Sequence, residues 1–429
     1  MIEPLTPNTQ VILLLVAPLI AGHRETSCDL LTLSEYNRLA RILREKRKQP
    51  ADLIGPDAGE LISLFAEHFG RERIEEMLGR GFLLSQAVER WNARAIWVIS
   101  RADPAYPKRF KARLKEDAPP VIYGCGDPAL LEKGGLAVVG SRHVDDEVVA
   151  FTENVGRLSA DAHRTVISGG AKGIDRAAMH GALLAGGDAA GVMADSLERA
   201  ALARDNREPL MDGRLVLISP YDPAAGFNVG HAMQRNKLIY ALADAAFVVT
   251  SDFEKGGTWA GAIEQLERLH FVPVFVRNGA NAGKGNQALL QRGAKPWPNP
   301  HDGKELSLAL VAAADAIAAE PKQESFSFRL REEPEGYETA KPEISGNDAV
   351  TESQPSDSQL SPSAKLLEAV GAILSAELTP VAEADVAEML AVSKLQAKKW
   401  LKALVRRGVL EKLAKPPRYQ AAKTSNKPL

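Results

Sequence analysis

The chain has 429 residues, and at roughly 100–200 residues per domain this length allows two to four domains. Lys and Arg total 53 while Asp and Glu total 55, so the chain as a whole is neither a polycation that coats nucleic acid nor an acidic solvating protein. Hydrophobic residues make up 45% of the chain, which is enough to build a sizeable buried core.

Residues 1–94 are predicted to form a helical region, because apolar residues recur there at helical spacing. The clearest run contains Leu61, Ile62, Leu64, Phe65 and Phe69. The apolar stretch from Val11 to Ala21 is too short to span a membrane, and it is not preceded by the basic cluster that begins a signal peptide. The two cysteines, Cys28 and Cys125, are too few for a disulfide framework or a thiolate metal site. We therefore expect a cytoplasmic protein with no membrane segment and no metal.

Residues 95–319 are predicted to form an extended Rossmann-like core. After an irregular entry over residues 95–128, short apolar runs alternate with helical stretches. The runs are Leu136–Gly140, Thr165–Ser168, Ala189–Met193, Leu215–Ser219, Ala246–Thr250 and Val272–Val276. The helical stretches are Asp145–Ala162, Ile174–Ala185, His231–Ala243 and Thr258–Leu269. Strands without inside/outside alternation that are separated by helices are typical of a parallel sheet covered on both faces, so the fold class is α/β.

The C-terminal part of the chain changes composition twice. Residues 320–362 hold ten acidic and four basic residues among Pro, Ser, Gly and Gln, which predicts a disordered acidic linker. Residues 363–420 follow as a basic domain with three helices and a hairpin over Val409–Tyr419, the order of a winged helix, and residues 421–429 as a tail.

The third helix of this basic domain buries a stripe made of Leu401, Leu404 and Val405. Its basic residues lie largely off that stripe. They are Lys394, Lys398, Lys399, Lys402, Arg406 and Arg407. Contact with DNA and docking of a protein remain open as roles for this face.

Ligands of an open parallel sheet bind beyond the carboxyl ends of its strands, so the residues after each strand form the candidate site. The first end is Gly140-Ser141-Arg142, where glycine lets a backbone approach closely and arginine offers a fork of donors to a phosphate. The second end opens a helix with backbone N–H groups exposed by glycines and with the charge of a lysine. Its candidate residues are Ser168, Gly169, Gly170, Lys172, Gly173 and Asp175.

The third end leads through a loop at Phe227 into a helix with two cations and two amides, which are expected to meet a phosphodiester and a base edge. These residues are Gln234, Arg235, Asn236 and Lys237. The fourth end places glycine amides and a hydroxyl at another helix N-terminus. Its residues are Gly256, Gly257 and Thr258. The four ends together predict a rim that binds phosphates, with no catalytic residue and no cofactor.

These motifs, in this order, resemble the DNA processing protein A family, also called DprA or Smf. The similarity also includes Ala178, His180 and Ile239, and upstream Ala105-Tyr106-Pro107. It covers about Asp103 to Ala294.

The resemblance implies an extended Rossmann fold that binds single-stranded DNA, usually as a homodimer. It further implies a recombination mediator that protects incoming DNA and loads the RecA recombinase during natural transformation. The family's DNA pocket corresponds to Arg142, the loop 168–173 and the helix with Arg235 and Lys237. Many members have an aromatic-Pro-Arg-Arg-Asn-Arg run where this chain has Ala232-Met233-Gln234-Arg235-Asn236-Lys237, which indicates a divergent branch.

Two other hypotheses stay open. Gly256-Gly257-Thr258, with Glu264 downstream, also resembles phosphoribohydrolases that cleave nucleoside monophosphates, although the spacing of Glu264 differs from the Gly-Gly-x-Gly-Thr-x-x-Glu of that family. The second hypothesis is a DNA-binding regulator that acts through the winged helix and uses the core as a nucleotide sensor. The sequence has no Walker Gly-x-x-x-x-Gly-Lys-Ser/Thr stretch and no Gly-x-Gly-x-x-Gly after the first strand, so ATP hydrolysis and dinucleotide binding are not supported.

Overall fold

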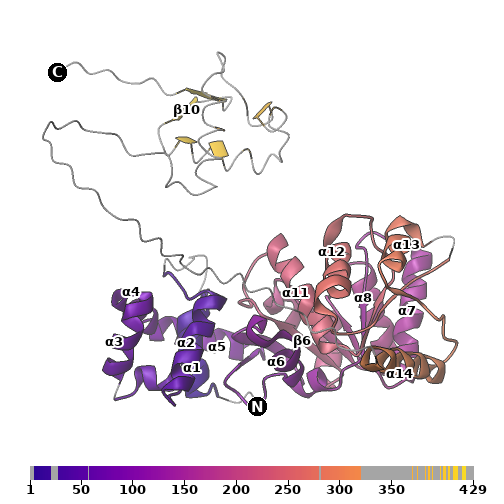
Figure 1. Ribbon diagram of the computed structural model, residues 1–429, viewed down its shortest axis with the longest axis horizontal. Helices are drawn as coiled ribbons and strands as arrows, with labels where there is room; N and C mark the ends of the chain where they lie inside the picture. Colours follow the sequence, from indigo (N-terminus) through magenta and orange to yellow (C-terminus); the bar gives the residue numbers. More distant parts are fainter. Residues whose placement is uncertain are drawn as a thin grey trace, which may run out of the picture. The chain divides into compact units, whose positions relative to one another are not determined.

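The computed structural model describes residues 4–20, 28–56, 58–279 and 282–319, together with isolated positions and short stretches between 370 and 421. The chain divides into two compact units, residues 1–326 and 327–429. The first unit contains five N-terminal helices and a nine-stranded sheet with helices on both faces (Figure 1). The predicted acidic linker and, apart from Ala421, the predicted C-terminal tail lie outside the described residues.

The N-terminal region consists of short helices that share a small core of their own. They are α1 (Pro7–Val16), α2 (Leu33–Glu45), the 3-10 turn η1 (Pro50–Ile54), α3 (Ala58–Phe69), α4 (Arg71–Leu78) and α5 (Gly81–Asn92). Helix α1 is apolar all round because it lies between two cores: Val11 and Leu15 pack in the helical core, while Ile12 and Leu13 pack toward the sheet. Within the described ranges, no helix combines the length and the apolar character that crossing a membrane requires.

The sheet has the strand order β1-β2-β6-β5-β4-β3-β7-β8-β9. Its parallel strands are β3 (Leu136–Val139), β4 (Val166–Ser168), β5 (Ala189–Val192), β6 (Leu215–Ser219), β7 (Ala245–Val248), β8 (Val274–Val276) and β9 (Lys295–Pro296). β2 (Val121–Gly126) runs antiparallel to β6, and β1 (Trp97–Ser100) antiparallel to β2. The mixed α/β fold with a mostly parallel sheet agrees with the expected fold class.

The expectation of an irregular entry over residues 95–128 was wrong, because this segment forms β1, α6 (Lys108–Leu114), the short turn η2 (Lys115–Asp117) and β2. Glycines in β2 hid the strand from the sequence pattern. A Cβ placed on Gly124 would lie 2.4 Å from the ring of Trp97 and 2.9 Å from the carbonyl oxygen of Leu217, so close packing across the sheet requires this glycine.

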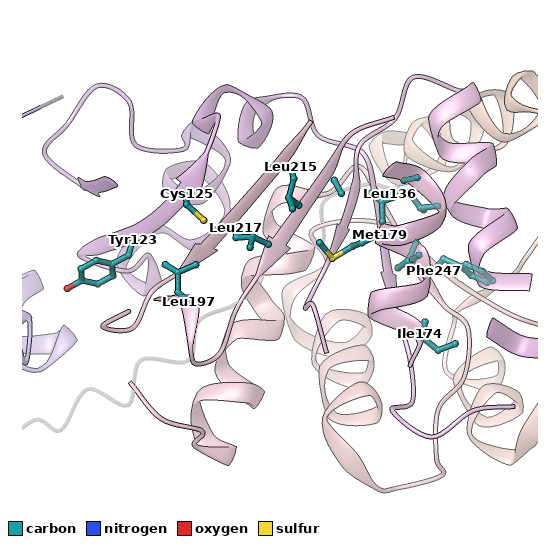
Figure 2. Packing of buried hydrophobic residues seen from close by; sticks show 14 of the residues in the cluster. Tyr123, Cys125, Leu136, Ile174, Met179, Leu197, Leu215, Leu217 and Phe247 are labelled. Atoms are coloured by element: carbon teal, nitrogen blue, oxygen red, sulfur yellow. The ribbon is translucent and has the colours of Figure 1, made fainter. Parts of the chain in front are cut away.

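Helices cover both faces of the sheet. One face packs against α7 (Asp146–Asp161), α8 (Ile174–Leu184), α9 (Leu197–Ala201), α10 (Arg204–Met211) and α14 (Gly303–Ala319). The other face packs against α6, η3 (Pro128–Glu132), α11 (Val229–Leu242), α12 (Gly256–Glu264), which continues as a π-helical turn over Gln265–Leu269, and α13 (Gly283–Gln291). Figure 2 shows the hydrophobic core on the first of these faces, where Leu136, Leu215 and Phe247 from the strands lie with Ile174 and Met179 of α8.

Polar contacts join the N-terminal helices to the sheet. Glu198 of α9 accepts hydrogen bonds from Arg90 at 2.7 and 2.6 Å and also pairs with Arg94. The Thr9 hydroxyl donates to the buried Asp103 carboxylate at 2.6 Å. The helical region and the sheet therefore form one packed unit, with α1–α5 gathered at one end of it (Figure 1).

The second unit is described at few positions. An antiparallel hairpin is formed by β10 (Leu410–Leu413) and β11 (Arg418–Ala421), where the sequence predicted a hairpin. Leu401 and Leu404 are buried in its core together with Tyr419. The winged-helix assignment remains a prediction, and the six basic residues of its third helix lie outside the described residues.

Candidate functional site

The ends of three neighbouring parallel strands, β4, β3 and β7, meet at one edge of the sheet. The chain order of the strands reverses between β3 and β7, which is the position where open α/β sheets bind ligands. The loops after these two strands are hydrogen-bonded to each other: the Ser141 N–H donates to the Thr250 hydroxyl at 3.0 Å, and the Thr258 hydroxyl donates to the Gly140 carbonyl at 3.0 Å. We call residues 140–142, 168–173, 175, 235 and 256–258 the strand-end site.

The loop after β4 closes tightly on the loop after β3. Gly173 has a φ of +82°, and a Cβ there would lie 2.5 Å from the Ser141 carbonyl oxygen, so only glycine fits. Ile174 donates its N–H to the same carbonyl at 3.4 Å. Ser168 donates its hydroxyl to the Val138 carbonyl at 2.6 Å and is buried, so it serves the sheet and does not face a ligand.

A buried ion pair lies beneath these loops. Arg235 of α11 and Asp175 of α8 are 6% and 9% exposed at their side chains, and Nη1 lies 3.9 Å from Oδ2. The guanidinium lies directly against Gly169, because a Cβ on that glycine would come 1.4 Å from Nη1. The sequence placed Arg235 in direct contact with phosphate, whereas the structure buries it as an internal partner of Asp175.

Burial governs the ionisation of this pair. Burial raises the pKa of Asp175, opposed by Arg235 and by hydrogen bonds from the backbone of Ala171, Gly140 and Gly169. Burial likewise lowers the pKa of Arg235. The glycine-loop amides therefore hold the protein's own carboxylate, and the pair ties the loops after β3 and β4 to α11.

The other polar residues of α11 do not act with Arg235 at one place, contrary to the sequence-based expectation. Asn236 donates from Nδ2 to the Gly257 carbonyl at 2.9 Å, which ties α11 to the N-terminus of α12. Lys237 pairs with Asp117 of η2 at 3.5 Å. Gln234 is exposed, and its Oε1 accepts a hydrogen bond from the Tyr221 hydroxyl at 3.4 Å. Successive residues of a helix point about 100° apart, which separates these side chains.

The outer surface of the strand-end site carries exposed cations and one exposed aromatic ring. Arg142 lies over the ring of Phe227 at 5.5 Å, and Phe227 is 58% exposed. Lys172 and Lys255 are exposed, as are Gly256 and Gly257. The sequence-based site omitted Phe227 and Thr250; an aromatic residue inside a Gly- and Asn-containing loop was the available signal for the first.

The enzyme hypothesis depends on Glu264. This residue lies six positions beyond Thr258, about 9 Å along α12, and pairs with Arg268 one turn further on. The Thr258 hydroxyl is already used by the Gly140 carbonyl. The structure thus does not place Glu264 beside the glycines of the loop. In the described part of the chain, no group of three or more His, Cys, Asp or Glu side chains is arranged to hold a metal ion.

Comparisons with known proteins find a matching family model and a similar curated protein. A family model described as DNA recombination-mediator protein A matches residues 97–306. The curated DNA processing protein DprA of Streptococcus pneumoniae is 28% identical over 182 residues, which cover 42% of this chain and 64% of that protein. The match thus spans less than two thirds of the relative's own length.

Two solved structures are also similar. The DprA structure from Streptococcus pneumoniae matches with a TM-score of 0.44 and 21% identity, over 65% of this chain and 98% of that one. The DNA processing protein A from Helicobacter pylori, described for its single-stranded DNA binding mode, matches with a TM-score of 0.42 and 24% identity, over 50% of this chain and 96% of that one. The family-model match encloses the range over which the motifs showed the resemblance, and residues 97–306 are therefore similar to the DNA recombination-mediator protein A (DprA/Smf) family.

Proposed function

We propose that this chain binds single-stranded DNA at the strand-end site and acts as a recombination mediator that passes the strand to a RecA-type recombinase. The observation that carries the proposal is the exposed Arg142–Phe227 stack beside glycine-rich loops at the switch point of the sheet. A cation and an aromatic face in one place suit a phosphate and its neighbouring base.

The cations of the site have separate roles in this proposal. Arg142, Lys172 and Lys255 are exposed and contact the DNA backbone directly. Arg235 acts from below, since it and Asp175 position the loops that hold the other groups. Its Nε and Nη1 atoms are buried without a hydrogen-bond partner among the described residues, so the guanidinium also keeps positive potential under the loops.

Phe227 provides the preference for unpaired bases. A base in a single strand can stack on an exposed ring, whereas a base in a duplex is already stacked on its neighbours. We expect Phe227→Ala to weaken binding to single strands by about 1–3 kcal/mol, with little effect on the weaker duplex binding.

Fluorescence anisotropy with a labelled oligothymidine at several salt concentrations tests the proposal. The negative log–log slope of affinity against salt should become less steep by about 0.7 when Arg142 or Lys172 is replaced by Ala, since each replacement removes one phosphate contact. Arg157→Ala is the control, because Arg157 is equally exposed but lies near the end of α7 in a pair with Asp161. An unchanged slope in both site variants, with the fold intact, would reject the strand-end site as the DNA site.

Loading of RecA and the homodimer are finer parts of the proposal, and they come from the family resemblance. The rate of ATP hydrolysis by RecA on DNA covered with single-strand-binding protein should rise when the full chain is added, and Arg142→Ala should remove the stimulation. Light scattering after size exclusion measures the oligomeric state. Absence of stimulation with intact DNA binding would limit the function to DNA binding.

The C-terminal basic face separates the mediator from the regulator hypothesis. Replacing Lys398, Lys399 and Lys402 together by Glu should lower affinity for duplex more than for single strands if that face enters a major groove. Nearly unchanged affinities for both, with loss of a protein partner or of the oligomer, would assign it to protein docking.

A further inference from the structure

A second concentration of positive charge lies on the N-terminal helical region, away from the strand-end site. Residues 38–48 contain six basic residues and one acidic residue, in a chain whose net charge is −2. Arg41, Arg44, Lys46 and Arg47 of this segment, on α2 and just beyond its end, are exposed. A helix C-terminus favours a cation in its last turn, but that effect does not account for four exposed cations.

The structure brings a second basic element to the same place. Asn37 of α2 donates from Nδ2 to the Glu116 carbonyl at 2.9 Å, and Arg41 Nε lies 4.0 Å from the Glu116 carboxylate. Glu116 lies in η2, directly after α6, and Lys111 of α6 and Lys115 of η2 are both exposed. We call Arg41, Arg44, Lys46, Arg47, Lys111 and Lys115 the basic surface.

These cations are little neutralised. Arg44, Lys46, Arg47 and Lys115 have no ion pair with any residue that the structure describes. Arg41 has a single acidic neighbour, and both members of that pair are more than half exposed, which makes the pair weak. The basic surface is thus available to a polyanion.

The elements beneath the basic surface are held rigidly. Thr32 and Glu35 form a capping box at the start of α2, and Glu35 accepts a hydrogen bond from Arg73 at 2.7 Å. Arg101 donates to Asn37 at 2.6 Å and lies over the ring of Tyr36. Because the backbone that carries the cations is already ordered, binding of a ligand costs only the ordering of the side chains.

The composition of the surface identifies the occupant. All of its members are cationic, and none of the exposed large hydrophobic side chains of the described chain lies between residues 31 and 53 or between 108 and 115. A protein-binding surface normally has an apolar or aromatic centre, whereas nucleic-acid backbones are bound by arginine forks and lysine charges. We propose that the basic surface is a second contact site for a nucleic-acid phosphate backbone, a proposal that rests on the proposed function.

Helix α11 connects the two sites. Arg235 and Asn236, midway along it, reach the strand-end site, where Asn236 donates to the Gly257 carbonyl at 2.9 Å. The next residue, Lys237, pairs at 3.5 Å with Asp117 beside the basic surface, and Arg113 of α6 donates to the Ala241 carbonyl at 2.9 Å. A strand of about thirty nucleotides is therefore long enough to contact both sites, whereas we expect one of about four nucleotides to occupy one of them.

The test compares oligothymidines of about four and about thirty nucleotides on the full chain carrying Arg41→Gln, Arg44→Gln and Arg47→Gln. The affinity for the long strand should fall about tenfold and its negative salt slope should become less steep by about 2, while the affinity for the short strand stays unchanged. A control variant with Arg157→Gln, Arg176→Gln and Arg268→Gln removes the same net charge from exposed ion pairs elsewhere and should change neither affinity. Lys111→Gln with Lys115→Gln repeats the test on α6 and η2, which covers the case that the α2 variant unfolds.

Each outcome decides between the proposals. Unchanged affinity for the long strand, or an equal loss for long and short strands, would overturn the basic surface. Tighter binding of DNA by the α2 variant would overturn it too, because it would show that the chain's own acidic segment 320–362 occupies the surface. If Arg142→Ala has no effect while the α2 variant loses affinity, the strand-end site fails and the basic surface stands.

Discussion

Replacing Arg235 by Met should destabilise the first unit strongly, because it leaves the Asp175 carboxylate buried without its cation. At the observed separation of 3.9 Å and an effective dielectric constant of about 20, the attraction between the two charges is about 4 kcal/mol. Loss of one partner from a buried pair costs about 3–5 kcal/mol for the same reason. Adding Asp175→Asn removes the unpaired charge, so we expect the double variant to recover about 2–3 kcal/mol relative to the sum of the single losses.

Urea unfolding followed by tryptophan fluorescence measures these values, since Trp91, Trp97, Trp259 and Trp297 all lie in the first unit. Additive losses, with a coupling below about 0.5 kcal/mol, would refute the reasoning. The pH dependence is a second check. Burial raises the folded-state pKa of Asp175, so this group favours folding below its ordinary pKa, and that contribution is lost as the pH rises through the raised value. The cost of Arg235→Met should therefore shrink when the pH is lowered, because a neutral Asp175 needs no cation.

Two further predictions concern the loops and the N-terminal helices. Gly173→Ala should lower both stability and DNA binding, because its Cβ would lie 2.5 Å from the Ser141 carbonyl oxygen. Gly257→Ala should leave the melting temperature unchanged, because the atom nearest to its Cβ would be 3.6 Å away. Equal melting temperatures for the two variants would contradict this reasoning. Glu35→Gln should cost about 1 kcal/mol near pH 7. The Arg73 hydrogen bond lowers the pKa of Glu35 to about 2, so the native contribution is present above about pH 4.5 and is lost as the pH falls toward 2; a pH-independent cost in urea titrations would argue against the pair.

Much of the sheet was predictable from the sequence because local patterns determine it. The six parallel strands from β3 to β8 and their helices follow from apolar runs that alternate with helical periods. β1 and β2 were missed, since Gly124 is selected by the Trp97 ring that packs on it, and this contact between strands leaves no local signal. Contacts between distant parts of the chain, rather than a local pattern, therefore determine where these two strands form.

The candidate site was predictable as a place but not as an arrangement of side chains. The glycines at residues 140, 169 and 173 indicated close backbone approach, and the structure brings the three loops together. The separate directions of Arg235, Asn236 and Lys237 depend on which helix face meets the sheet, which the sequence alone did not specify. Charge alone likewise did not distinguish a buried arginine from exposed ones such as Arg142.

The pairing of β2 with β6 has a consequence for how the chain folds as it is synthesised. Tyr123 of β2 pairs with Ser219 of β6, 96 positions further along the chain. At about 5–20 residues per second, β2 waits about 5–20 s on the ribosome before its partner exists. During this time the edge of β2 that will face β6 presents unpaired N–H and C=O groups next to apolar side chains, a template for wrong pairing. The N-terminal helices, which pack on that side of the sheet, therefore complete their docking only after the distant β6 has emerged, and a truncated chain that ends before residue 219 should depend on chaperones to stay in solution.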